Sequence, residues 1–280
     1  MKIVFADIDG TFIKDREIPP ENIEAVKFLE KSGNRFVFVS GRGEGQIEDI
    51  LQQGGFDCDY IYGNGAGYRF LGEEPILQHY IPASEYDYWE NLFVENKAFY
   101  TIHTTEGILM QPLEDISHHF DYLKDVYAEI YGIEMAQYLE NKKNDYYGKK
   151  AIFAKNPFDY LREHLDVKLI KFELLNGEED IRSNISRLAS DIGYLAFSSV
   201  RINLEIVPAL SNKGEAIKNY LTNFENVEKT YGFGDALNDL EMFEVVDVAV
   251  AVENAMEEVK EICDVILNEE MGTYILREVF

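Results

Sequence analysis

The sequence predicts an α/β protein with a Rossmann-like core built on a parallel sheet, into which a separate α+β domain is inserted. Two observations predict this fold. Short apolar strands alternate with helices at both ends of the chain, an order typical of parallel sheets with helices on both faces. Between them, residues 83–207 are rich in aromatic side chains and mix helices with strands. We therefore expect a discontinuous core of residues 1–82 and 208–280 around an inserted domain of residues 83–207.

The first strand is predicted by the continuous apolar run IVFA at residues 3–6, which is typical of a strand buried on both faces. It ends in D-I-D-G-T at residues 7–11. Two buried carboxylates disfavour folding unless something neutralises them. A divalent cation with oxygen ligands is the simplest partner, and an acidic turn after an edge strand is the alternative. Gly10 allows the turn and leaves backbone N–H groups open to an anion.

The next elements continue the alternation of helix and strand. Pro20 opens a helix that Gly33 ends, and residues 35–39 form a second buried strand that stops at S-G-R, residues 40–42. Another helix follows, and then a strand at 60–62 that leads into G-N-G-A-G. Because ligands of such sheets bind at the carboxyl ends of the strands, the position of Asp7, Asp9 and Ser40 at these ends predicts a site there.

The middle of the chain is predicted to alternate helices with strands. We expect helices at about 84–96, 114–131, 157–164 and 178–190, and strands at about 98–104, 149–154, 167–175, 194–198 and 201–206. The many aromatic residues at these spacings indicate core and rim positions rather than a cofactor site.

The core is predicted to resume after Pro208. A helix at 212–223 is followed by three strand-loop units, whose strands lie at about 230–233, 246–250 and 264–267. The first of these strands runs into the acidic loop G-D-A-L-N-D at residues 234–239.

Length and charge restrict the function. A chain of 280 residues holds one large or two ordinary domains. The net charge of −26 disfavours nucleic acid and anionic membranes as partners, because phosphate backbones attract basic surfaces. A small anionic substrate stays possible, since a local metal ion and one lysine outweigh a diffuse negative field.

The cellular location is predicted from the absence of other signals. The two cysteines do not form a disulfide framework. Asp7 and Asp9 interrupt any apolar segment of a signal peptide, and no run approaches the roughly 18 apolar residues that span a bilayer. We expect a cytoplasmic protein.

The residues at the strand ends suit hydrolysis of a phosphate ester. That reaction needs a nucleophile, neutralisation of the transferring group, and a proton for the leaving oxygen. Asp7 can serve as a covalent nucleophile. Asp9 can give a proton to the leaving oxygen and later act on water. Ser40 can donate a hydrogen bond to a phosphoryl oxygen, Lys213 adds a cation at a helix N-terminus, and Asp235 can share a Mg²⁺ with Asp7.

Four motifs in this order resemble those of the haloacid dehalogenase superfamily. They are D-x-D-G-T at 7–11, S-G-R at 40–42, S-N-K-G at 211–214 and G-D-x-x-N-D at 234–239. N-G-A at 64–66, E-I-x-P at 205–208 and N-A at 254–255 are similar to further landmarks of its Cof-type branch. The long insert between the second and third motifs implies a type IIB cap domain.

The resemblance implies a mechanism and a set of site residues. Asp7 would be the nucleophile of an aspartyl-phosphate and Asp9 the general acid/base. Mg²⁺ would be bound by Asp7, by the backbone carbonyl of Asp9 and by Asp235, with Asp239 counted among the candidate ligands. The substrate would be a small phosphorylated metabolite such as a sugar phosphate. Its candidate contacts are Gly10, Gly41, Arg42, Asn64, Lys171 and Asn238.

The sequence leaves two alternative functions open. The same scaffold could carry a phosphotransferase or mutase, in which a sugar hydroxyl takes the phosphoryl group in place of water. It could also be a regulatory binding protein without catalysis, although the complete set of motif residues argues against this. The sequence determines neither the substrate nor the oligomeric state.

Overall fold

The chain forms two units. The computed structural model describes residues 1–14, 17–176, 178–198 and 203–279. Contacts within the chain separate a core unit, Met1–His79 with Leu210–Phe280, from an inserted unit, Tyr80–Ala209. The sequence placed the divisions after residue 82 and before residue 208. Each unit has its own sheet.

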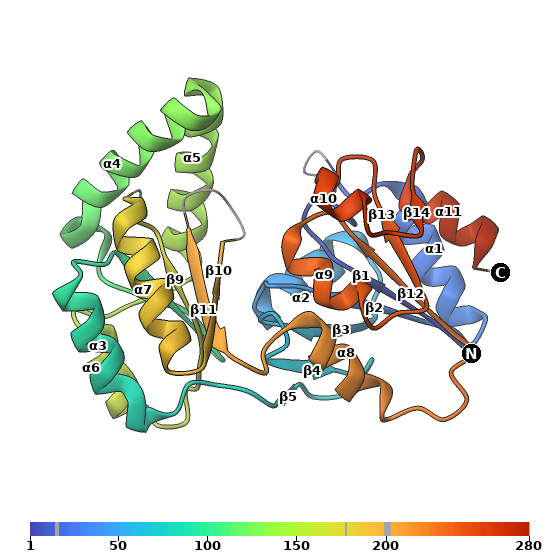
Figure 1. Ribbon diagram of the computed structural model, residues 1–280, viewed down its shortest axis with the longest axis horizontal. Helices are drawn as coiled ribbons and strands as arrows, with labels where there is room; N and C mark the ends of the chain where they lie inside the picture. Colours follow the sequence, from blue (N-terminus) through green and yellow to red (C-terminus); the bar gives the residue numbers. More distant parts are fainter. Residues whose placement is uncertain (15–16, 177, 199–202, 280) are drawn as a thin grey trace. The chain divides into compact units, whose positions relative to one another are not determined.

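The core unit contains strands and helices from both ends of the chain (Figure 1). Its first part consists of β1 (Lys2–Ala6), α1 (Pro20–Lys31), β2 (Arg35–Val39), α2 (Glu44–Gly54), β3 (Asp59–Tyr62), β4 (Gly67–Arg69) and β5 (Ile76–Leu77). Its second part consists of α8 (Lys213–Leu221), β12 (Lys229–Gly234), the short 3₁₀ helix η2 (Leu237–Asp239), α9 (Leu240–Phe243), β13 (Val248–Ala251), α10 (Glu257–Lys260), β14 (Val265–Ile266) and α11 (Met271–Glu278).

The core sheet has the strand order β14-β13-β12-β1-β2-β3-β4-β5. The strands from β14 to β3 run parallel, and β4 and β5 add an antiparallel edge. Strand β1 lies inside this sheet, between β12 and β2, and its apolar run is buried. The predicted α/β core with a parallel sheet is therefore confirmed, and the carboxyl ends of β1, β2 and β12 lie side by side.

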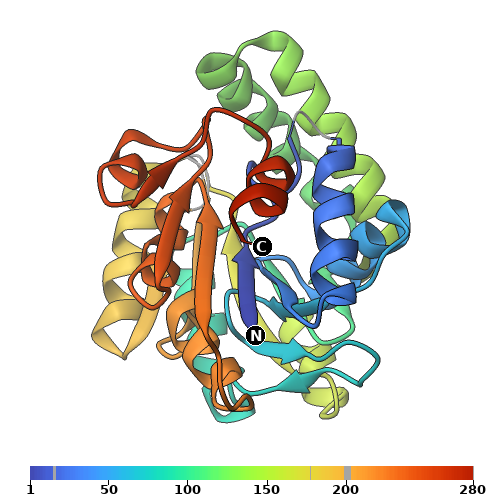
Figure 2. The ribbon, with the colours of Figure 1, turned by 90° about the vertical axis from the view of Figure 1, so that its right-hand side faces the viewer.

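The two ends of the chain meet in the core unit (Figure 2). Helix α1 begins with Pro20 in its first turn and buries Ala25, Val26 and Leu29. Nζ of Lys2 donates to the backbone oxygen of Val279 (2.7 Å). This hydrogen bond and the pairing of β1 with β12 join residues from opposite ends of the sequence.

The inserted unit also carries a sheet with helices. It contains the 3₁₀ helix η1 (Ala83–Glu85), α3 (Tyr86–Glu95), β6 (Tyr100–Thr104), β7 (Gly107–Met110), α4 (Leu113–Tyr131), α5 (Ile133–Lys150), β8 (Ala151–Phe153), α6 (Pro157–Glu163), β9 (Leu169–Leu174), α7 (Glu179–Asp191), β10 (Tyr194–Phe197) and β11 (Leu204–Pro208). The strand order is β10-β11-β9-β6-β7-β8, with all pairs antiparallel except β7 and β8.

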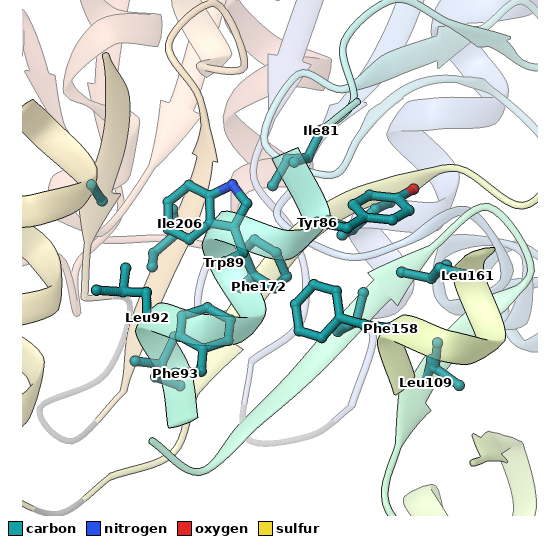
Figure 3. Packing of buried hydrophobic residues seen from close by; sticks show 14 of the residues in the cluster. Ile81, Tyr86, Trp89, Leu92, Phe93, Leu109, Phe158, Leu161, Phe172 and Ile206 are labelled. Carbon is teal, nitrogen blue, oxygen red and sulfur yellow. The ribbon is translucent and has the colours of Figure 1, made fainter. Parts of the chain in front are cut away.

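Aromatic side chains form the core of the inserted unit (Figure 3). Trp89 of α3 packs against Phe172 of β9 with 5.1 Å between ring centroids, and Phe93 meets the same ring edge-on at 4.9 Å. Such tilted and edge-to-face contacts are favoured by the ring quadrupoles. A second cluster, which includes Phe99 and Met110, packs with α4 and α5. The aromatic residues of these clusters are therefore core residues, as the sequence indicated.

Two elements of the inserted unit were not predicted. Strand β7 is short and pairs with β6 across a tight turn. Helix α5 extends to Lys150, so the start of the strand expected at 149–154 was wrong, and β8 begins at Ala151. Among the described side chains of α5, Ala136 and Tyr147 join a buried cluster, which leaves little apolar periodicity to detect. The strand expected at 201–206 starts in residues 201–202, outside the described residues, and β11 begins at Leu204.

Both cysteines, Cys58 and Cys263, are free thiols. Burial raises the pKa of the Cys58 thiol well above its ordinary value, so this thiol is unreactive at neutral pH. None of the described helices has the length and apolar character that crossing a bilayer requires.

An acidic group in the core unit links stability to pH. Glu30, half-buried in α1, lies near Asp57 and Asp59. Burial and these two negative charges raise the pKa of Glu30 to about 7, although Arg35 opposes the shift. The folded chain therefore holds a proton on Glu30 that the unfolded chain releases near its ordinary pKa of 4.5. The contribution of Glu30 to the stability of the fold is fully present below pH 4.5 and is lost as the pH rises through about 7.

The substitution Glu30→Gln should raise the melting temperature at pH 8, because it removes a charge that the folded state disfavours. The gain over wild type should disappear near pH 4, where Glu30 is protonated in both states. Thermal unfolding followed by circular dichroism measures the difference. Glu24→Gln, on the exposed side of the same helix, controls for the loss of one negative charge. An equal gain for both variants would contradict the assignment.

Candidate active site

Three strands of the core sheet end beside one another in polar residues. Asp7 follows β1, Ser40 follows β2 and Asp235 follows β12. The backbone N–H of Asp7 still donates to the carbonyl of Phe233 (2.9 Å), so the ladder between β1 and β12 continues up to the acidic residue. The sheet therefore fixes the position from which the Asp7 side chain starts.

A tight turn follows Asp7. The backbone N–H of Phe12 donates to the carbonyl of Asp7 (3.2 Å), and that of Gly10 donates to the carbonyl of Ile13 (3.1 Å). Gly10 has a φ of +89°, and a Cβ there would collide with the carboxylate of Asp235. Glycine is therefore required at this position both by its backbone conformation and by the closeness of Asp235.

Lys213 is the buried cation of the site. Its Nζ donates to Oδ1 of Asp7 (2.6 Å) and to Oδ1 of Asp239 (2.6 Å), and its side chain is 1% exposed. It is the first residue of α8, where the side chain of Asn212 caps the helix by accepting the N–H of Glu215 (2.8 Å). The motif lysine thus joins the first and the fourth motif.

Asp239 is held on both of its carboxylate oxygens. While Oδ1 accepts from Lys213, Oδ2 accepts the backbone N–H groups of Asp235 (3.0 Å) and Ala236 (3.1 Å). Asp239 is completely buried. These contacts fold the loop after β12 around the carboxylate, so Asp239 orients both Lys213 and the backbone that carries Asp235.

The structure adds two residues to which the sequence assigned no role. The hydroxyl of Thr11 donates to Oδ1 of Asp235 (2.8 Å), and Nδ2 of Asn254 donates to the carbonyl of Gly10 (2.9 Å). Both residues lie in motifs that were recognised, D-x-D-G-T and N-A. Their presence in those motifs was the available signal, but a motif does not show which atom a side chain contacts.

The charged groups of the cluster shift one another's pKa values. Burial, together with the negative charges of Asp239 and Asp235, raises the pKa of Asp7 to about 7 against the lowering effect of Lys213. Burial and Asp239 also raise the pKa of Asp235 to about 6. Burial disfavours the Lys213 ammonium, but Asp239 and Asp7 hold its pKa above the ordinary value. The site thus has more negative charge than one lysine balances.

The cluster fits a divalent cation. One carboxylate oxygen from each of Asp7, Asp235 and Asp239 can be chosen so that all three lie within 4.8 Å of one another, the one group of this kind in the described part of the chain. Carboxylate oxygens are the ligands that Mg²⁺ prefers in proteins. A bound cation would also balance the excess negative charge.

The carboxylates of Asp9 and Asp7 contact different basic residues. Its carboxylate accepts two hydrogen bonds from Arg42, at 2.8 Å from Nε and 2.7 Å from Nη2. The carboxylate of Asp9 does not belong to the three-aspartate cluster, although its backbone carbonyl stays a predicted metal ligand.

The loops after β2 and β3 are tied together. The backbone N–H of Ser40 donates to the carbonyl of Ile61 (3.0 Å), and that of Asn64 donates to the carbonyl of Ser40 (2.9 Å). Gly41 lies against Asn64, since a Cβ on Gly41 would stand 2.8 Å from its Oδ1. The structure thus brings these three predicted site residues together, and their contacts with substrate stay predictions.

Two further predicted contacts belong to other elements of the chain. Asn238 lies in η2, next to Asp239. Lys171 lies on β9 of the inserted unit, where its buried Nζ donates to Oε2 of Glu205 (2.5 Å). The substrate contacts proposed for both residues stay predictions.

The sequence is similar to those of known hydrolases. The sequence profile described as haloacid dehalogenase-like hydrolase matches residues 4–271. The chain is 27% identical over 283 residues to the 5-amino-6-(5-phospho-D-ribitylamino)uracil phosphatase YwtE of Bacillus subtilis, a match that covers 93% of this chain and 91% of that protein.

Comparisons of the structure show the same fold. A haloacid dehalogenase-like hydrolase from B. subtilis superposes with a TM-score of 0.83 at 20% identity, covering 99% of this chain and 100% of that one. A sugar phosphatase of haloacid dehalogenase subclass IIB superposes with a TM-score of 0.70 at 20% identity, covering 99% and 98% of the two chains. At this level of identity the likeness shows the fold.

The substitution Lys213→Met should lower the free energy of unfolding by about 3–5 kcal/mol, because it leaves Asp7 and Asp239 buried without their cation. Urea unfolding in the absence of divalent ions measures the loss. Lys218→Met is the matched control on the same helix, where the lysine forms an exposed pair with Glu215 and should contribute less than about 1 kcal/mol. Equal stability of wild type and Lys213→Met would contradict the role of this cation.

Proposed function

The chain belongs to the haloacid dehalogenase-like hydrolase family, and from this membership we propose that it is a Mg²⁺-dependent phosphatase that hydrolyses a small phosphorylated metabolite through an aspartyl-phosphate on Asp7. The observation that carries the proposal is the contact of Lys213 with both Asp7 and Asp239, with Asp235 close by. This cluster combines a carboxylate nucleophile, a buried cation and oxygen ligands for a metal ion.

The family and its relatives support a phosphoric monoester hydrolase, as the sequence predicted. The named relative YwtE acts on a phosphorylated ribityl compound, and a structural neighbour is a sugar phosphatase. Both names describe a phosphate ester of a small hydroxyl-bearing molecule. They support a sugar phosphate or a similar metabolite as the substrate.

In the proposed first step, a carboxylate oxygen of Asp7 attacks phosphorus and the bond from phosphorus to the leaving oxygen breaks. The leaving oxygen takes a proton from the carboxyl group of Asp9 and departs as an alcohol. In the second step water attacks the phosphorus of the aspartyl-phosphate and gives its proton to Asp9. The bond between Asp7 and phosphorus breaks, and the products are inorganic phosphate, the carboxylate of Asp7 and the protonated carboxyl group of Asp9.

Other residues of the core unit support these steps. Lys213 orients Asp7 and supplies positive charge at the point where negative charge develops. The Ser40 hydroxyl, at the end of β2, is proposed to donate to a phosphoryl oxygen. Asp7, Asp235 and the backbone carbonyl of Asp9, with Asp239 as a further candidate ligand, would hold Mg²⁺, which when bound supplies further positive charge against the phosphate.

The substitution Asp7→Asn should reduce phosphate release by about 10³-fold or more, because the amide is not a nucleophile. Release from p-nitrophenyl phosphate and from a set of sugar phosphates with Mg²⁺ measures the change. The variant should keep the circular dichroism spectrum of the wild type. Near-normal turnover by a folded Asp7→Asn variant would reject Asp7 as the nucleophile.

Removal of divalent ions with a chelator should abolish activity, and added Mg²⁺ should restore it. The substitution Asp235→Asn should weaken Mg²⁺ binding measured by titration calorimetry, because a neutral amide is a poorer ligand than a carboxylate. Asp191→Asn, in an exposed pair with Arg187 of the inserted unit, controls for the loss of one charge. Full activity without any divalent ion would refute the dependence on a metal.

A further inference from the structure

Arg42 donates two hydrogen bonds to the carboxylate of Asp9. Nε of Arg42 lies 2.8 Å from Oδ2 of Asp9, and Nη2 lies 2.7 Å from Oδ1. This is the fork geometry in which a planar guanidinium meets a carboxylate, and it restricts direction as well as distance. A lysine offers a single charged point and does not provide the same restriction.

The backbone that carries Arg42 is held on both sides. Its N–H donates to Oγ of Ser40 (3.2 Å), and its carbonyl accepts the N–H of Gly63 (2.8 Å). These two hydrogen bonds therefore fix the backbone of Arg42 in the loop after β2, against the loop after β3. Its side chain is 23% exposed, so part of it is enclosed by the protein.

The backbone of Asp9 is held as well, but its side chain is open to solvent. Asp9 forms a bridge with Ile13 across the turn after β1, and its side chain is 59% exposed. An exposed carboxylate without such a contact samples several rotamers. The two hydrogen bonds from Arg42 favour one of these rotamers.

We propose that Arg42 is a positioning residue for Asp9, rather than a contact for the substrate. The inference rests on the proposed function, in which Asp9 gives a proton to the leaving oxygen and takes one from the attacking water. Each oxygen of Asp9 has a second lone pair outside the fork, and the proton is carried there. The two carboxylates of the first motif are then held by different cations, Asp7 by Lys213 and Asp9 by Arg42. This separation keeps Asp9 away from the buried lysine that Asp7 requires.

The exposure of the Asp9 carboxylate separates this role from a structural one. Exposed ion pairs contribute little to stability, whereas a misplaced acid/base group loses much of its contribution to rate. Removal of the guanidinium should therefore change turnover and leave the melting temperature nearly unchanged.

The test compares Arg42→Ala and Arg42→Lys with wild type on p-nitrophenyl phosphate and a sugar phosphate, with Mg²⁺ present. We expect kcat to fall by about 10- to 100-fold in Arg42→Ala, with KM changed less than about twofold because only the orientation of Asp9 is lost. Arg42→Lys should recover only a small part of the loss, and free guanidinium should partly restore Arg42→Ala. Arg277→Ala is the control, because Arg277 forms exposed pairs with Glu269 and Glu278.

A second comparison places Arg42→Ala in the background of Asp9→Asn. If Arg42 acts through Asp9, the double variant should be no slower than Asp9→Asn alone. A rise of KM in both backgrounds would overturn the proposal, because it would show that Arg42 binds the substrate. Wild-type kcat in Arg42→Ala would overturn it as well. Failure of wild-type protein to release phosphate would instead refute the proposed function.

Discussion

The site depends on one buried ammonium group. Lys213 donates to Asp7 and to Asp239, and all three side chains are almost completely shielded from solvent. A buried ion cluster is a poor means of gaining stability, because the desolvation of its charges opposes their attraction. An apolar core would serve the fold better at this position. The cluster is therefore best explained by what it holds in place, a carboxylate at the end of the central strand with a second carboxylate, Asp235, beside it.

The parallel sheet makes this arrangement possible. The strands β1 and β12 pair along their length, so the residues that follow them emerge together although more than two hundred positions separate them in the chain. The N-terminus of α8 brings Lys213 to the same edge, and Asp239 ties the loop after β12 to it. Gly10 permits the close approach of Asp235 because a side chain there would occupy the space of its carboxylate.

Much of this could be predicted from sequence. The apolar run of β1, the acidic residues directly after it, and the alternation of helix and strand predicted the core sheet, and the fold and the family are confirmed. Helix α5 and strand β7 were missed, because the helix buries few described apolar side chains and the strand is short. The direction of the Arg42 side chain, the contact of Thr11 with Asp235 and that of Asn254 with Gly10 depend on tertiary geometry that residue spacing does not contain.

The central claim is that Asp7 is both a ligand of the divalent ion and the group that accepts the phosphoryl group. Diffraction from crystals grown with Mn²⁺ and beryllium fluoride tests it most directly, since Mn²⁺ scatters anomalously and the fluoroberyllate mimics a phosphoryl group on a carboxylate. The account predicts an anomalous peak in contact with Asp7 and Asp235, and fluoroberyllate bonded to an oxygen of Asp7. Crystals with Mn²⁺ bound elsewhere, or with fluoroberyllate on another residue while Asp7 stays unmodified, would contradict it.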